Sequence, residues 1–129
     1  MANLSTYTKG ELIKHIFRTG AFTKPAALYL ALYVGATEVA GGAYARVAVG
    51  PSDATWAAQV GGNGATSNVA DVVFPAPTAN WGTVTAFKIL DAITAGNIII
   101  EGSLATPKTV NNGDPAPKFP ATVLLGTFA

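Results

Sequence analysis

Side chains that could support acid–base or metal chemistry are few in this sequence. The chain has one histidine, His15, and no cysteine, so a Ser-His-Asp or Cys-His constellation would have to use His15. Glu11 is the only carboxylate at helical spacing from His15, and such an i,i+4 pair is ordinarily a solvated surface pair. Zinc requires three or four His, Cys or carboxylate ligands at suitable spacings, which the sequence does not offer. We therefore expect no catalytic residue, no metal site and no cofactor.

The remaining polar motifs also favour structural roles. Asp53, Asp71 and Asp91 lie beside turns or strand ends, where a carboxylate commonly accepts hydrogen bonds from local amides. The glycine-rich segment at residues 61–64 lacks the Lys-Ser/Thr of a phosphate loop and precedes no helical pattern, so it is expected to be a plain loop. These features predict a protein that is not an enzyme.

Three larger side chains are candidates for contacts with a partner. Trp56 and Trp81 could stack on a base or a sugar, but no cations accompany them, which favours a core or interface role. Arg46 is a cation inside a predicted strand. It could pair with an acidic group across a subunit interface or lie on a solvated face.

The charge composition argues against several classes of partner. Eight basic and seven acidic residues make up 12% of the chain, against about 25% in a typical domain. The cations are scattered, whereas a nucleic-acid-binding protein clusters them. No apolar run approaches the roughly 18 residues that span a bilayer, and the N-terminus does not resemble a secretory signal, so we expect a soluble protein made in the cytoplasm. A surface with so few charges suits a subunit covered in an assembly, although a small monomer is the alternative.

One helix is expected near the start of the chain. Thr8 and Glu11 have the spacing of a capping box, and Arg18 and Gly20 supply stop signals. The apolar residues that follow the cap fall on one helical face: Leu12, Ile13, Ile16 and Phe17. This face is expected to cover part of a sheet or to dock on a neighbouring subunit.

The rest of the chain reads as short strands. Leu28, Leu30 and Leu32 alternate with Tyr29 and Tyr33, as a half-buried strand requires. Six strand-like segments recur at short intervals: residues 26–34, 44–49, 69–74, 84–90, 97–104 and 119–128. The predicted fold is mainly β, an antiparallel β-sandwich or small barrel with one short N-terminal helix, in a single domain spanning residues 1–129.

The two ends of the chain are expected to form extended arms, at residues 1–8 and 114–129. Pro115, Pro117 and Pro120 cannot donate ladder hydrogen bonds, so the final segment suits an extended contact with a partner. Together with the three larger side chains considered above, this segment completes the set of proposed interface residues: Arg46, Trp56, Trp81, Pro115, Pro117 and Phe119. The alternative is that residues 119–128 fold back as a core strand, because Val123, Leu124, Leu125 and Phe128 are apolar.

Four stretches of the chain resemble a family of small virion proteins of tailed phages and prophages, often labelled tail-fibre proteins; they are residues 20–32, 41–46, 74–84 and 102–114. Similar small β-rich proteins serve as capsid decoration, or cement, proteins. The resemblance implies a virion structural protein without catalytic residues.

On this basis the leading expectation is a capsid decoration protein that bridges coat subunits. Its partners would be the major capsid protein and copies of itself, as a homo-oligomer in the virion, with neither nucleic acid nor membrane. The alternatives are a tail or fibre component and a carbohydrate- or receptor-binding module in which Trp56, Trp81 and the tyrosines form the platform.

Overall fold

The computed structural model describes residues 2–62 and 64–127. In these residues one helix, α1 (Thr6–Phe17), follows the first of ten strands. The strands are β1 (Ala2–Leu4), β2 (Tyr29–Val34), β3 (Thr37–Glu38), β4 (Val47–Ala48), β5 (Ala65–Ser67), β6 (Val72–Val73), β7 (Gly82–Leu90), β8 (Ile98–Val110), β9 (Lys118–Phe119) and β10 (Leu125–Thr127). The expectation of a mainly β, antiparallel sandwich-like fold with one short helix is confirmed.

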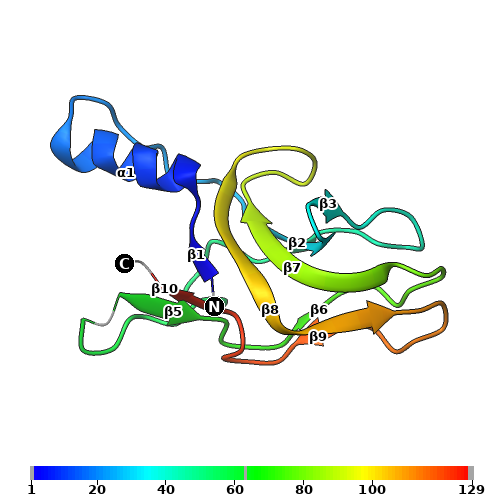
Figure 1. The fold of residues 1–129 in the computed structure, drawn as a ribbon. Helices are drawn as coiled ribbons and strands as arrows, with labels where there is room; N and C mark the ends of the chain where they lie inside the picture. The colour runs from blue at the N-terminus through cyan, green and yellow to red at the C-terminus, as the bar shows by residue number, and fades with distance from the viewer. Residues whose placement is uncertain (1, 63, 128–129) are drawn as a thin grey trace.

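The strands form one large sheet and one small one. The large sheet has the order β3-β2-β7-β8-β1-β10-β5, with β4 also paired to β2, and the small sheet pairs β6 with β9. All pairings are antiparallel except β1 with β10. The long strands β7 and β8 curve through the middle of the molecule, and β6 and β9 lie below them in Figure 1.

The main core lies between the large sheet and the β6–β9 pair. Leu30 and Leu32 of β2 point into it, whereas Ala31 and Tyr33 join a second, smaller cluster on the other face, as the alternation predicted. The ring of Phe119 in β9 lies 6.4 Å from that of Phe74 and 5.7 Å from that of Phe87, measured between centroids. Aromatic contacts therefore join the two sheets.

Several strands differ from the predicted segments. Residues 44–49 and 69–74 contribute only the two-residue strands β4 and β6, and the short strand β5 was not predicted. Strand β8 extends past Leu104 and includes Pro107. Its pairing with β7 shifts register between Ser103 and Lys108, so that Thr85 alone stands opposite residues 104–107. Pro107 is tolerated because it lies in this bulge, where no ladder hydrogen bond is required of it.

The start of the helix was predicted at the wrong residue. The N-cap is Ser5, whose hydroxyl accepts a hydrogen bond of 3.1 Å from the Thr8 amide. Thr8 instead lies inside α1, and its hydroxyl donates to the Ile99 carbonyl at 2.9 Å. Glu11 forms an ion pair with Lys14 at 2.7 Å. The capping box proposed for Thr8 and Glu11 is therefore absent, because tertiary contact with β8 recruits Thr8.

The two segments expected to be extended arms are part of the fold. Strand β1 is paired on both sides, with β8 and β10, and Ala2 is buried. In the C-terminal segment, β9 pairs with β6, β10 pairs with β1 and β5, and Leu124 is buried. The alternative that this segment folds back is thus correct, but the segment forms two short strands instead of one, and Val123 is exposed. The expected burial of the Leu125 and Phe128 side chains lies outside what the structure describes.

Candidate docking surface

The predicted contact residue Arg46 lies inside the chain's own structure. Its guanidinium forms two 2.8 Å hydrogen bonds with the Glu38 carboxylate and donates to the carbonyls of Ala92 and Ala95 at 2.7 and 2.8 Å. The Arg46 side chain is only 6% exposed. Both expectations for it, an intersubunit ion pair and a solvated face, are therefore wrong.

The electrostatics around Arg46 fit a structural ion pair. The Arg46 guanidinium holds the pKa of Glu38 below its usual value, and Glu38 in turn raises the pKa of Arg46. Tyr44 completes the cluster by donating its hydroxyl to Glu38 at 2.9 Å, and burial raises its pKa. The loop after β7 is thereby fastened to the segment between β3 and β4.

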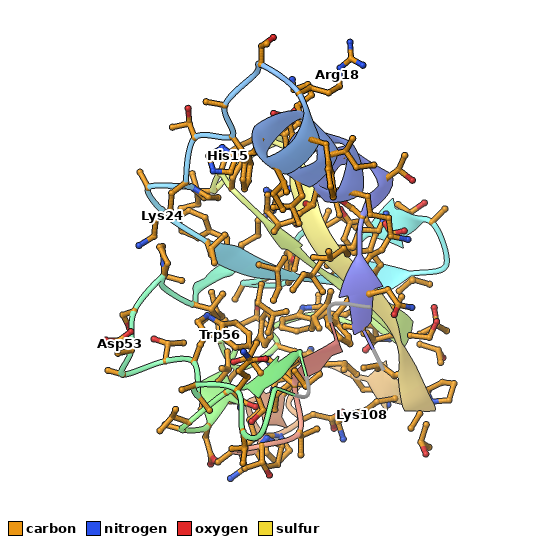
Figure 2. The ribbon with its side chains drawn as sticks, turned by 90° about the vertical axis from the view of Figure 1, so that its left-hand side faces the viewer. His15, Arg18, Lys24, Asp53, Trp56 and Lys108 are labelled. Carbon is orange, nitrogen blue, oxygen red and sulfur yellow. The ribbon has the colours of Figure 1, made fainter. Side chains whose placement is uncertain are left out.

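The two tryptophans do not form a shared platform. Trp81 is 6% exposed, and its indole N–H donates to the Gly42 carbonyl at 2.9 Å. Gly42 has φ +56°, and a Cβ there would lie 2.9 Å from the Trp81 indole nitrogen, so this contact requires glycine. Trp56 is half-buried, donates to the Val49 carbonyl at 2.6 Å, and lines a shallow depression with Lys24 and Asp53 (Figure 2).

The proline-rich C-terminal candidates divide between surface and core. Pro115 is exposed. Pro117 is buried, and its carbonyl accepts a 2.8 Å hydrogen bond from the Phe74 amide. Phe119 packs against Phe74 and Phe87. Pro117 and Phe119 thus stabilise the fold, and both also line an apolar groove at the surface, so their proposed role as interface residues stays a prediction.

Of the titratable residues that we set aside as structural, His15, Asp71 and Asp91 have hydrogen-bond partners, whereas the exposed Asp53 has none among the described residues. His15 does not pair with Glu11; its Nδ1 accepts a hydrogen bond of 3.2 Å from the Phe22 amide. Asp91 accepts from the Asn97 amide, in the local capping role predicted for it, whereas Asp71 accepts from the distant Ala121 amide. Within residues 2–62 and 64–127, no three His, Asp or Glu side chains gather in a way that could hold a metal ion. None of the helices there is long and apolar enough to cross a membrane.

Helix α1 is attached to the body through its first turn. The Ser5 hydroxyl donates to the Ile98 carbonyl, the Ser5 amide donates to the Ile99 carbonyl at 3.0 Å, and Thr8 is the only residue of α1 that is buried. Figure 1 shows the rest of α1 extending away from β8, beside the sheet and not over one of its faces. The anchor was missed in the sequence, although Ser5 is of a residue type that is preferred at the N-cap of a helix.

The apolar face of α1 is exposed. Ile13 is 53% exposed, Ile16 64% and Phe17 80%. The expectation that this face covers part of the sheet is wrong, and the alternative that it docks on a neighbour stays a prediction. Because adjacent exposed apolar side chains on one helix commonly mark an interaction site, α1 is our main candidate docking surface.

The helical end of the molecule is positively charged. Half of the chain's eight cations fall within its first 24 residues, together with one carboxylate, Glu11; the cations are Lys9, Lys14, Arg18 and Lys24. Lys9, Ile13 and Ile16 have the i, i+4, i+7 spacing of one helical face. Figure 2 shows Arg18 at this end of the molecule, whereas Lys24 lies lower, at the depression that it lines with Asp53 and Trp56. The apolar face is therefore bordered by positive charge.

A second apolar surface lies at the opposite end of the molecule. A groove with a volume of about 330 Å³ runs between the outer half of β8 and the segment around β9. Its lining includes Leu104, Phe119 and Val123, and the cations Lys108 and Lys118. Lys118 forms an ion pair with Asp71 at 3.0 Å. In Figure 2, Lys108 lies far below α1.

Comparison with known proteins gives one family match. A family model described as podophage GP4 fiber I protein gp80 matches residues 3–127, nearly the whole chain. The chain belongs to this family. The gp80 fiber family is one of phage virion proteins, which confirms the resemblance on which the virion assignment was based. No curated protein matches the chain.

Membership of the gp80 fiber family also bears on the place in the virion. The family's description names a fibre protein, which supports the general expectation that the chain is a structural protein of a phage virion. The leading expectation, that the chain decorates the capsid, is not supported by this description. The alternative, a tail or fibre component, fits the family better.

Proposed function

We propose that this chain is a non-enzymatic structural subunit of a phage fibre that joins a neighbouring virion protein through the exposed face of α1. The observation that carries the proposal is the exposure of Ile13, Ile16 and Phe17 on a helix that only its first turn holds to the body. The fibre location is supported by the description of the family.

The sheet body serves in this proposal as a rigid support. The joined sheets, the aromatic contacts between them and the Arg46–Glu38 ion pair give the body a fixed shape. Each of the three exposed apolar side chains would contribute about 1–2 kcal/mol on burial, before the entropy of association is subtracted. A single helix therefore gives a moderate affinity, which many copies in one particle would multiply.

Self-assembly is the second part of the proposal. The low charge of the chain supports a homo-oligomer within the fibre. Sedimentation of the purified chain over a range of concentrations tests this part: a defined oligomer supports it, and a monomer at all concentrations contradicts it.

Location in the virion is tested with purified particles of the phage that encodes the chain. Gold-labelled antibody should mark fibres or the tail region, and quantitative mass spectrometry should give far fewer copies than of the coat protein. Labelling spread evenly over the capsid, with a copy number close to that of the coat protein, would favour a decoration protein instead.

A further inference from the structure

The apolar face of α1 lacks a cover from its own chain. The helix contacts β8 and β1 through its N-terminal turn, and the Tyr7 ring meets the Phe22 ring edge-on at 6.5 Å. Phe17, in the last turn, is 80% exposed. A large aromatic side chain exposed at the free end of a helix gains most from burial in a partner's pocket.

Charge decides what kind of partner fits this face. Lys9 lies on the same side of α1 as Ile13 and Ile16, and Arg18 and Lys24 follow the helix. The carboxylate Glu11 is already paired with Lys14. Complementary potentials require carboxylates on the partner beside its apolar surface, and like charges there would oppose binding.

A second copy of the chain is a poor partner for this helix. The apolar groove on the body is bordered by Lys108, which would repel the cations of an incoming α1, and by Lys118, whose charge is already paired with Asp71. Two α1 faces packed together would also bring like charges into proximity. Glu38 and Asp71, two of the body's carboxylates, are already engaged with Arg46 and Lys118.

We infer that α1 docks, by its Ile13, Ile16 and Phe17 face, into an apolar groove bordered by carboxylates on a different virion protein. The inference rests on the proposed function as a virion structural subunit and adds the chemistry of the partner. The binding mode is that of an amphipathic helix in a groove, with apolar residues as anchors and the surrounding lysines and arginine selecting an acidic rim.

The test uses particles of the encoding phage that were assembled without this protein, to which the purified chain is added back. Attachment is measured by co-sedimentation, and circular dichroism checks that each variant is folded. The double variant Ile16→Ser with Phe17→Ser should bind roughly tenfold or more weakly, as expected when interface anchors are lost. Val60→Ser, an exposed apolar residue outside α1, is the matched control and should bind as the wild type does.

Charge is tested separately. Lys9→Glu with Arg18→Glu should weaken attachment by roughly tenfold and reduce its salt dependence, because two favourable charges become repulsive. Lys108→Glu, at the other end of the molecule, is the control and should have no such effect. Attachment that is unchanged or stronger in the Lys9/Arg18 variant would overturn the acidic-partner inference.

Other occupants would give different results. Self-association that the Ile16/Phe17 variant abolishes would assign the face to a second copy. Binding to phosphatidylglycerol vesicles but not to particles, lost in the same variant, would assign it to a lipid surface. Either result overturns the inference. Wild-type chain that fails to attach to particles and is absent from virions overturns the proposed function itself, whereas wild type and helix variants that attach equally overturn the docking inference alone.

Discussion

The two ends of the chain contribute to the molecule in opposite ways. The C-terminal segment places Pro117, Phe119 and Leu124 in the core, whereas α1 leaves Ile16 and Phe17 in solvent. Both ends are similarly apolar in sequence. The difference indicates that the C-terminal segment serves folding, whereas the exposed face of α1 is free to bind, because an apolar side chain stabilises the monomer only where the monomer buries it.

Removing the C-terminal segment should have the largest effect. A chain truncated after Gly113 loses β9 and β10, and with them the partners of β6, β1 and β5. The lost burial and pairing should exceed the whole stability of a small domain, about 5–15 kcal/mol, so the truncated chain should be unfolded. Circular dichroism and a thermal melt measure this, and a cooperative melt near the wild-type temperature would make the C-terminal segment dispensable.

A single core residue in that segment gives the next largest effect. Leu124→Ala should lower the free energy of unfolding by about 3 kcal/mol, because it leaves a cavity in the core. The neighbouring Val123 is exposed, so Val123→Ala should change stability by less than about 0.5 kcal/mol. Urea unfolding of the two variants provides the measurement. Equal losses would show that the segment is not packed as described.

The Glu38–Arg46 pair tests whether the body is stabilised independently of both ends. Glu38→Gln should cost about 2 kcal/mol at neutral pH, because Arg46 loses its charged acceptor. The pKa of Glu38 is lowered in the folded protein, so its contribution is present above the ordinary value of 4.5 and is lost as pH falls through the folded-state pKa.

The stability of wild type and Glu38→Gln should therefore converge in acid. Urea unfolding at about pH 7 and about pH 3 measures the difference at each pH. The exposed Glu101→Gln is the control and should show little difference at either pH. A Glu38 variant whose deficit is as large in acid as at neutral pH would contradict the pKa assignment.

The anchor of α1 should matter less than the core. Thr8→Ala removes the buried hydrogen bond to the Ile99 carbonyl and should cost about 1 kcal/mol. Thr6→Ala, an exposed residue in the same turn, should be nearly silent. Thermal melts compare the two, and identical melting temperatures would mean that Thr8 does not fasten the helix to β8.

The exposed face of α1 should contribute least to stability. Phe17→Ser should change the free energy of unfolding by no more than about 0.5 kcal/mol, because the monomer does not bury the ring. Urea unfolding below any self-association concentration measures this. A loss above about 1 kcal/mol would show that Phe17 packs on its own chain.

Local sequence patterns correctly predicted the features that depend on a single helix, strand or turn. The alternation from Leu28 to Tyr33 identified a strand with one face in the core, since side chains alternate along any strand. The spacing of Leu12 to Phe17 identified a one-sided helix. The position of Asp91 beside a turn also indicated its capping role, because the amide that it caps, that of Asn97, lies in the same turn.

Local sequence patterns could not predict which distant segments pack or pair with one another. The sequence by itself determined the mainly β class, the short helix, its apolar face and the family resemblance, because each follows from periodicity or residue identity along the chain. Only the tertiary structure decided that Arg46 is buried against Glu38, that Pro117 and Phe119 lie in the core, and that Phe17 is uncovered. The burial of a side chain depends on which segments pack beside it, and local sequence does not specify those segments.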